Sequence, residues 1–381
     1  MISTTGQRLF INRSDLHSVQ IGADPDAPGS RALQLGEARL EVQRFALTAN
    51  NITYAAFGEA MKYWQFFPAP DAAWGCLPVW GFTQVVESRA DGVEPGQRVY
   101  GYLPAGTHLV VQPARVSSKG FTDAAAHRQP LAVIYNQYSR CKSSSVDADE
   151  AIQESLRAVL QPLFMTAFLL DDFLAENGFF GARQLLLSSA SSKTAMATAY
   201  GLGQRRGTAG HPTVVGLTSA SNRDFVQGLG CYDRTLLYGD VAQLDPHTPT
   251  VYVDFSGSAG VRTLVHSHFG DQLSFSSAIG GTHWTDLGGS TGLPGPRPSL
   301  FFAPSQAAQR SAPPPAGWGR DVLEQRIAQA WQRFAHHVLA GPQPWVHISQ
   351  QHGAQAAEAG YRALLEGRAP PSQGLTLSLL Q

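Results

Sequence analysis

The chain has 381 residues, and its 28 lysines and arginines nearly balance its 29 aspartates and glutamates, for a formal net charge of −1. A nucleic-acid-binding protein normally carries a basic excess that displaces counterions from phosphates, so the balance argues against that class. Apolar residues make up 43% of the chain, enough to offset the ordering entropy of a folded core and to exclude a disordered chain. At about 100–200 residues per domain, the length predicts two domains.

The spacing of the cysteines and the length of the apolar runs indicate the cellular compartment. Cys76, Cys141 and Cys231 are far apart and lack the spacing of a disulfide framework or a zinc ribbon. The N-terminus lacks the basic and apolar segments of a signal peptide, and no run approaches the ~18 uninterrupted apolar residues of a membrane span. We therefore expect a cytoplasmic protein that binds neither membrane nor nucleic acid.

The first 130 residues carry short apolar runs separated by glycine, proline, asparagine and aspartate. The alternation in these runs predicts strands of a largely antiparallel, barrel-like sheet, for example at 38–47, 80–87, 97–102 and 108–112. Pro95 and Gly96 predict a tight turn between the second and third of these strands.

The pattern of apolar residues changes near residue 147. A helical stretch is predicted over 147–177, either as one helix or as two helices broken at Pro162, and Gly178 and Gly181 end it. Strands then alternate with helices: strands at 184–188, 213–217, 234–237, 250–255 and 272–278, and helices at 191–206, 221–229 and 260–269. Short apolar strands alternating with helices of this size predict a parallel sheet with helices on both faces, a doubly wound Rossmann-like domain.

The last hundred residues begin with a loop rich in glycine and proline after Gly280. A strand is expected at 300–303 and a helix at 320–339, and the tail predicts a strand at 345–349, a helix at 354–366 and a strand at 375–379. A tail of this kind can complete the first domain. We therefore predict a barrel-like catalytic domain of 1–150 plus 340–381 and a dinucleotide-binding domain of 151–339.

The segment 185–195 (LLLSSASSKTA) joins a buried strand to a helix through small residues. In a dinucleotide-binding unit, small residues let the backbone approach the pyrophosphate, which meets the helix N-terminus. Here Ser191 and Ser192 stand where the usual fingerprint has glycine, and Lys193 and Thr194 follow. Hydroxyls and an ammonium can donate to phosphate oxygens. The turn therefore predicts an anion site, and the alternative is that Ser191 only caps the helix.

The second strand–helix turn, 218–223 (TSASNR), lies where a dinucleotide's adenosine ribose is bound. An acidic residue there would bind the 2′-hydroxyl and repel a 2′-phosphate. This turn has hydroxyls and Arg223 instead, which favours NADP over NAD. The alternative is that Arg223 is a solvated residue in the first turn of a helix.

The order of a barrel, a Rossmann unit and a C-terminal return resembles the medium-chain dehydrogenase/reductase superfamily, in particular its zinc-free quinone-reductase and enoyl-reductase branch. The resemblance is carried by 46–58 (ALTANNITYAAFG), 78–101, 185–202, 214–238, 253–257 and 356–377. The serine-rich turn is similar to that of an uncharacterised, divergent subgroup. The resemblance implies an α/β fold, in which a Rossmann-like doubly wound parallel sheet accompanies a GroES-like β-barrel domain.

The resemblance also implies a cofactor, NADP, and the residues that bind it. Ser191, Ser192, Lys193 and Thr194 fall on the pyrophosphate turn. Arg223 and Tyr238 fall around the adenosine phosphate, where Ser219 could join them. The nicotinamide-ribose side would be lined by Ser256 and Gly257, and Gly280 would begin the loop after the fifth strand, which also carries Gly281 and His283.

Zinc-dependent members of the superfamily use cysteine, histidine and glutamate ligands early in the barrel. Their Gly-His-Glu position is Trp80-Gly81-Phe82 in this sequence, so we expect no metal site. Hydride transfer would then proceed without Lewis-acid help, onto an activated C=C bond or a quinone.

Candidate catalytic residues come from the barrel. Enoyl-reductase relatives use a tyrosine near the segment that contains Tyr54 and Tyr63, and Tyr63 is the better candidate. Asn51 could orient a substrate carbonyl or the nicotinamide amide. The alternatives are an aromatic cluster that closes the barrel and an ordinary turn asparagine.

Two functions remain open from the sequence. The first is an NADPH-dependent, zinc-free reductase of a small enoyl, enone or quinone substrate. The second is a reductase-like binding or assembly protein that has lost turnover because bulkier side chains fill the pyrophosphate groove. In either case the resemblance implies a homodimer, formed through the sheet edge at 272–278 and 300–303.

Overall fold

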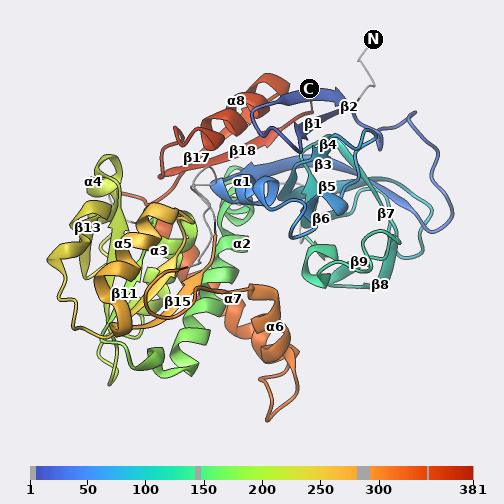
Figure 1. The fold of residues 1–381 in the computed structure, drawn as a ribbon. Helices are drawn as coiled ribbons and strands as arrows, with labels where there is room; N and C mark the ends of the chain where they lie inside the picture. The colour runs from blue at the N-terminus through green and yellow to red at the C-terminus, as the bar shows by residue number, and fades with distance from the viewer. Residues whose placement is uncertain (1–5, 142–146, 281–291, 341–342, 381) are drawn as a thin grey trace. The chain divides into compact units, whose positions relative to one another are not determined.

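The computed structural model describes residues 6–141, 147–280, 292–340 and 343–380 (Figure 1). The chain divides into two compact units, one formed by 1–159 with 348–381 and the other by 160–347. Antiparallel pairing dominates the first unit, and a parallel sheet forms the second. The predicted α/β fold class, with one doubly wound parallel sheet and a separate barrel-like domain, is confirmed.

The first unit contains two sheets within its described residues. One has the strand order β2-β1-β4, and the other has the order β17-β18-β3-β5-β6-β10-β9-β8, with β7 paired to β3. The strands are β1 (Gln7–Asn12), β2 (Val19–Ala23), β3 (Ala38–Leu47), β4 (Trp74–Cys76), β5 (Pro78–Ser88), β6 (Arg98–Pro104), β7 (His108–Val111), β8 (Pro113–Ser117), β9 (Gly120–Asp123), β10 (Gln137–Arg140), β17 (His347–His352) and β18 (Gln373–Ser378).

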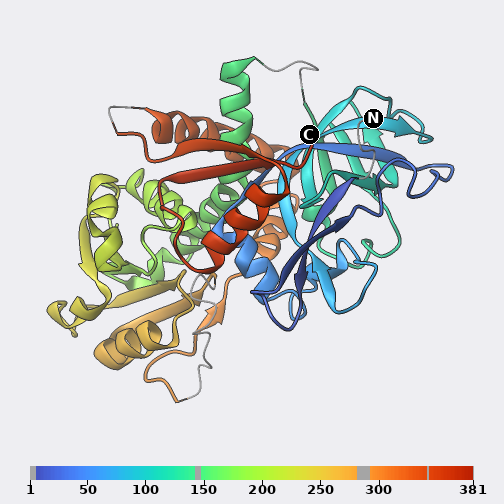
Figure 2. The ribbon, with the colours of Figure 1, turned by 90° about the horizontal axis from the view of Figure 1, so that it is seen from above.

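The C-terminal tail joins the N-terminal strands. β18 pairs antiparallel with β3, with Leu375 opposite Leu47, and α8 (Ala354–Leu365) connects β17 to β18. Figures 1 and 2 show this return as red elements beside the blue β3. Residues close to the two ends of the chain therefore complete one sheet.

A short helix follows β3, in a segment that resembles the family's early strand and substrate loop. α1 (Ala49–Ala56) begins after Thr48, whose backbone N–H donates to the Asn51 Oδ1 at 2.7 Å. This satisfies a backbone donor at the start of the helix. Two 3-10 helices, η1 (Tyr63–Gln65) and η2 (Val133–Asn136), lie further along the same unit.

The second unit contains a parallel sheet of order β13-β12-β11-β14-β15-β16. Its strands are β11 (Gln184–Leu187), β12 (Thr213–Thr218), β13 (Arg234–Leu237), β14 (Thr250–Asp254), β15 (Leu273–Ala278) and β16 (Ser299–Leu300). The chain builds outward from β11 on one side and from β14 on the other. The strand order therefore reverses between β11 and β14, which is the topological switch point of a doubly wound fold.

α3 (Lys193–Gly203) connects β11 to β12, α4 (Arg223–Gly228) connects β12 to β13, and α5 (Ala259–Phe269) connects β14 to β15 (Figure 1). The central strands are buried; Leu185, Leu186 and Leu187 have no exposed surface. Strands covered on both faces require such continuous apolar runs. One core cluster of this unit packs Leu186 and Tyr252 against Val265 and Phe269 of α5.

α2 (Ala148–Glu176) is a single helix that contains Pro162, so the alternative of two helices is wrong. Proline removes one backbone donor, but packing on both sides of it can hold a helix together. By length and composition, α2 could cross a membrane, which the sequence analysis did not anticipate. However, 56% of its most apolar window is buried inside the protein, as in the core helix of a globular fold.

The strand predicted at 300–303 is shorter than expected. β16 contains only Ser299 and Leu300, and α6 (Ala303–Ser311) begins immediately afterwards with Pro304 in its first turn. Proline is well suited to that position because the N–H that it lacks has no helical partner there. α7 (Arg320–Leu339) has the predicted bounds.

Candidate functional site

The predicted nucleotide-binding turn lies at the carboxyl end of β11. Ser189 has a φ of +49°, and α3 begins at Lys193, with Ser192 as its N-cap. A left-handed conformation is uncommon for residues other than glycine and is often found at functional turns. Ser189, which the sequence analysis missed, therefore holds a conformation that glycine adopts readily. Ser192 caps the helix by accepting from the Ala195 N–H at 3.3 Å, so the alternative that Ser191 is the cap is wrong.

Side chains from later in the chain hold this turn. The Tyr238 hydroxyl accepts from the Ser189 N–H at 3.2 Å, and the Tyr232 hydroxyl donates to the Ala190 carbonyl at 2.8 Å. Asn222 donates to the Ser191 hydroxyl at 3.0 Å. Tyr238, predicted beside the adenosine phosphate, is thus brought to the turn, and burial raises its pKa to about 12.

Close packing sets the distance between this turn and β12. A Cβ at Gly216 would lie 2.9 Å from the Cβ of Ala190 and 2.9 Å from the ring of Tyr232. Ala190 is fully buried. The essential glycine is therefore on the neighbouring strand rather than in the turn, where the usual fingerprint has it.

Lys193 is the cation nearest to the start of α3. Its side chain is half-buried, and burial lowers the pKa of its ammonium to about 8. Desolvation disfavours the charged form, so a nearby anion would stabilise the ammonium and reverse the shift. Thr194 follows in the first helical turn, and its carbonyl accepts from the Thr198 hydroxyl at 2.9 Å.

The turn after β12 is the second predicted contact region. β11 and β12 are parallel neighbours, with Leu187 opposite Gly216, so their carboxyl ends lie at one edge of the sheet. The Ser219 and Ser221 hydroxyls are 2.9 Å apart, and Arg223 is exposed at the start of α4. Within the described residues, the buried Thr218 hydroxyl has no hydrogen-bond partner.

The switch point between β11 and β14 carries a buried polar network that the sequence analysis missed. The Ser188 hydroxyl donates to Asp254 Oδ1 at 2.9 Å and accepts from the Ser256 N–H at 3.1 Å. Arg262 Nε and Nη2 donate to Asp254 Oδ2 at 3.1 and 3.0 Å. Asp254 is only 2% exposed. One sequence feature could have indicated this network: an acidic residue, Asp254, directly follows the apolar strand residues VYV.

This network gathers three predicted residues around Asp254. The Ser256 hydroxyl and the Gly257 N–H donate to Asp254 Oδ1 at 2.8 and 3.0 Å, and the Gly280 N–H donates to the Asp254 carbonyl at 3.5 Å. The structure therefore brings the predicted nicotinamide-side residues to the same edge as the pyrophosphate turn. Gly281 and His283 lie outside the described residues.

The predicted catalytic tyrosines belong to an aromatic cluster in the first unit. The ring centroids of Tyr54 and Tyr63 are 4.6 Å apart, and Trp80 Nε1 donates to the Tyr54 hydroxyl at 3.3 Å. Two further members are Tyr102 of β6 and Tyr135 of η2, whose ring centroids are 4.7 Å apart. Neither was predicted from the sequence, because their positions give no local signal.

Burial raises the pKa of all four hydroxyls above the ordinary tyrosine value. Removing these groups from water disfavours the tyrosinate, so each hydroxyl keeps its proton at neutral pH. Within the described residues, the buried hydroxyl of Tyr102 has no hydrogen-bond partner. An unpaired buried donor of this kind is one that a bound oxygen acceptor would satisfy.

Asn51 lies in the same unit but uses its amide within the fold. Its Oδ1 accepts from the Thr48 N–H, and its Nδ2 donates to the Pro78 carbonyl at 2.8 Å. Asn51 is 3% exposed. These bonds tie the start of α1 to the start of β5 and so help to position Tyr54.

Comparisons with known proteins agree with this architecture. The chain is similar in structure to CurA from Vibrio vulnificus in complex with NADPH, with 13% identity, a TM-score of 0.57 and coverage of 98% of this chain and 99% of that one. It is also similar to the quinone oxidoreductase from Coxiella burnetii, with 10% identity, a TM-score of 0.53 and 98% coverage of both chains. YhdH from E. coli K-12 with bound NADPH is 15% identical, with a TM-score of 0.52 and coverage of 98% and 100%.

These structural similarities establish the fold, and the predicted resemblance to the quinone-reductase and enoyl-reductase branch is confirmed at the level of the fold. A search of curated proteins found no match. Residues 45–370 match the family model described as "Protein of unknown function (DUF2855)". The chain therefore belongs to the DUF2855 family and shares the fold of the enoyl reductase and quinone oxidoreductase structures to which it is similar.

Proposed function

We propose that this protein is an NADPH-dependent, zinc-free reductase that delivers hydride to an activated C=C bond or a quinone. The observation that carries the proposal is the gathering of the β11 turn and the Asp254 network at the switch point of the parallel sheet. Doubly wound folds bind dinucleotides in the crevice at this point. Similar structures determined with NADPH support the choice of cofactor.

The residues at this edge fit a dinucleotide phosphate. Lys193 and the Ser191 hydroxyl would bind the pyrophosphate at the start of α3, because a desolvated ammonium gains most from a nearby anion. Arg223 would bind the 2′-phosphate, and the Thr218 hydroxyl, which has no partner among the described residues, offers a further hydrogen bond. Ser256, Gly257 and Gly280 would line the nicotinamide side. When bound, the cofactor supplies the hydride.

The tyrosine cluster would bind the substrate oxygen. The raised pKa values of Tyr54 and Tyr63 make them neutral hydrogen-bond donors rather than proton-releasing acids. Such donors polarise a carbonyl and stabilise the negative charge that develops on its oxygen. The proton that completes the reduction would then come from water, or from Tyr63 once the developing negative charge has made the substrate basic enough to accept it.

Cofactor titration tests this proposal. We expect NADPH to bind with a Kd of micromolar order, and NADH more weakly, in a calorimetric or fluorescence titration of the purified protein. Arg223→Ala should weaken NADPH binding about tenfold and leave NADH binding unchanged, because only NADPH carries the 2′-phosphate. Arg234→Ala, an exposed arginine at the opposite end of the parallel strands, is the matched control. Equal affinity for the two cofactors would contradict the proposal.

A second candidate is a reductase-like scaffold without turnover. It is favoured by the engagement of the turn's own groups: Ser192 caps α3, and Ser191 is bonded to Asn222. Cooperative unfolding of the purified protein would show that it is folded. If neither NADPH nor NADH binds to that folded protein, the second function replaces the first.

A further inference from the structure

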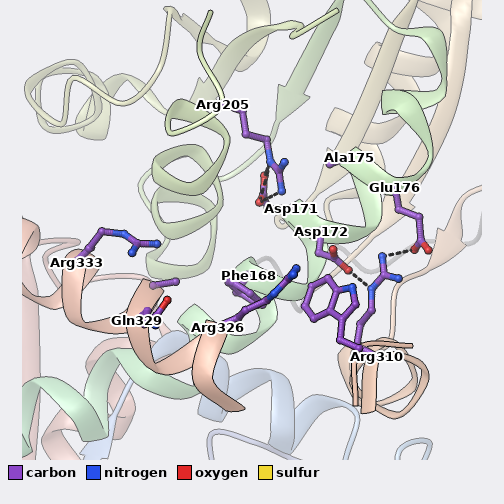
Figure 3. A pocket seen from close by; sticks show the side chains of 12 residues that line it. Phe168, Asp171, Asp172, Ala175, Glu176, Arg205, Arg310, Arg326, Gln329 and Arg333 are labelled. Atoms are coloured by element: carbon purple, nitrogen blue, oxygen red, sulfur yellow. Dashed lines mark hydrogen bonds and ion pairs between the residues drawn. The ribbon is translucent and has the colours of Figure 1, made fainter. Parts of the chain in front are cut away.

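The second unit contains a pocket of about 490 Å³ that the proposed reductase does not use (Figure 3). Its walls come from the C-terminal half of α2, from α6 and α7, and from Arg205, which follows α3. α3 begins at the nucleotide turn, and its 11 residues span about 16 Å before Arg205 is reached. The pocket is therefore at the far end of α3 from the proposed nucleotide site.

Trp318 organises one wall of this pocket. Its indole lies between two guanidinium groups, with the Arg310 Cζ 4.8 Å and the Arg326 Cζ 4.2 Å from the ring centroid. Arg310 is anchored to α2, because its Nε donates to Asp172 at 2.6 Å and its Nη2 pairs with Glu176 at 2.7 Å. The anchored Arg310 fixes Trp318, and Trp318 in turn orders Arg326.

Arg326 and Arg333 lie on the pocket-lining face of α7, seven residues apart and with Gln329 between them (Figure 3). Both side chains are exposed, and neither forms an ion pair with a residue that the structure describes. A guanidinium stacked on an aromatic ring keeps its N–H edge available for bidentate bonds to an oxyanion. Arg326 is thus ordered before a ligand binds.

The acidic residues of the pocket do not cancel this charge. Asp171 accepts from Arg205 Nε at 2.8 Å and from Arg205 Nη2 at 2.8 Å, and Arg310 pairs with Asp172 and Glu176. All three carboxylates are therefore paired, whereas two of the four lining arginines have no carboxylate partner in the described chain. The result is a positive potential inside the pocket.

We infer that this pocket binds a small organic oxyanion, a carboxylate or a phosphate ester, through Arg326 and Arg333. Its volume falls in the range of metabolite sites rather than that of a single inorganic ion. Phe168, Ala175 and Ala330 provide apolar wall for the carbon skeleton, and Gln329 adds a neutral hydrogen-bonding group. The site is independent of the proposed hydride transfer.

Calorimetric titration of the whole protein, with NADPH present in saturating amount, tests the inference. The probes are succinate and glucose 6-phosphate, with inorganic phosphate as the bare oxyanion. We expect saturable one-to-one binding of at least one organic anion, about tenfold tighter than inorganic phosphate. Which probe binds tells the carboxylate from the phosphate ester.

Arg326→Gln and Arg333→Gln should each weaken that binding about tenfold, because each removes a charge-assisted hydrogen bond. Arg320→Gln is the control, since Arg320 lies on α7 outside the pocket and pairs with Glu324. NADPH affinity should be the same in all three variants, which separates this test from that of the reductase. Binding of no organic probe, binding no tighter than that of phosphate, or equal binding by Arg326→Gln and Arg320→Gln would each overturn the inference.

Discussion

The sheet edge that carries Asp254 in the second unit and the tyrosine cluster of the first unit are built by opposite means. At this edge, the carboxylate of Asp254 is almost fully buried and accepts six hydrogen bonds from described residues, namely Ser188, Ser256, Gly257 and Arg262. In the cluster, rings pack at centroid distances of 4.6–6.4 Å, and the Tyr102 hydroxyl has no partner among the described residues. The Asp254 edge is stabilised by directional hydrogen bonds to a buried carboxylate. The tyrosine cluster is stabilised by the packing of aromatic rings.

This difference sets how each region should respond to substitution. A buried charge depends on every partner, so removing one group leaves another uncompensated. Aromatic packing is spread over many weak contacts, so a hydroxyl can be removed at little cost when it makes no bond.

The largest effect is expected in the Asp254 network. Asp254→Ala leaves the Arg262 guanidinium buried without its carboxylate and should lower the free energy of unfolding by about 3–5 kcal/mol. Urea denaturation measures it. Asp271→Ala, an exposed aspartate of the same unit, should change stability by less than about 0.5 kcal/mol. Equal stability of the two variants would show that the network does not depend on charge.

A matched pair of tyrosines tests the first unit. The Tyr138 hydroxyl accepts from Arg128 Nη1 at 2.9 Å and donates to the Tyr102 carbonyl at 2.7 Å. Tyr138→Phe should therefore lower the free energy of unfolding by about 1–3 kcal/mol, because both groups lose their partner. Tyr102→Phe removes a hydroxyl without a partner and should leave stability unchanged or slightly raised. The contrast fails if Tyr102→Phe is the more destabilising of the two in the same denaturation experiment.

The pH dependence of stability reports on Lys193. Its pKa in the folded protein is about 8, below its ordinary value, so the unfolded chain binds more protons between pH 8 and pH 10.5. Stability contributed by this group should therefore rise with pH in that window, by at most about 1.4 kcal/mol per pH unit. Urea denaturation at pH 8, 9 and 10 should show a smaller rise in Lys193→Met than in the wild type. Lys62→Met, at an exposed lysine, should keep the wild-type slope.

The smallest effect separates helix capping from phosphate binding at Ser192. Ser192→Ala removes the N-cap of α3 and should lower the free energy of unfolding by about 1 kcal/mol. Ser192→Asp keeps a good N-cap but places a negative charge at the expected pyrophosphate site. It should therefore retain wild-type stability in denaturation and lose NADPH binding in calorimetry. Retained NADPH binding in Ser192→Asp would remove this serine from the cofactor site.

Local patterns predicted the regular elements well. β3, β13 and α7 have the bounds expected from apolar periodicity, which depends only on residues close in sequence. The sequence left one helix or two helices open at Pro162, and tertiary packing accommodates the proline within a single α2. The helix α6, which has Pro304 in its first turn, was not predicted, because a strand was expected at 300–303.

The sequence by itself determined the α/β class, the alternation of strands and helices, and the turns in which Ser192, Lys193 and Arg223 stand. Only the tertiary structure decided which polar groups meet. Ser188 and Asp254 are 66 residues apart, and they bond because β11 and β14 are neighbours at the switch point. The same holds for Tyr54 and Tyr102, whose rings meet where α1 packs against β6. Hydrogen bonds and ring contacts depend on distance in space, and sheet order, not sequence spacing, sets that distance.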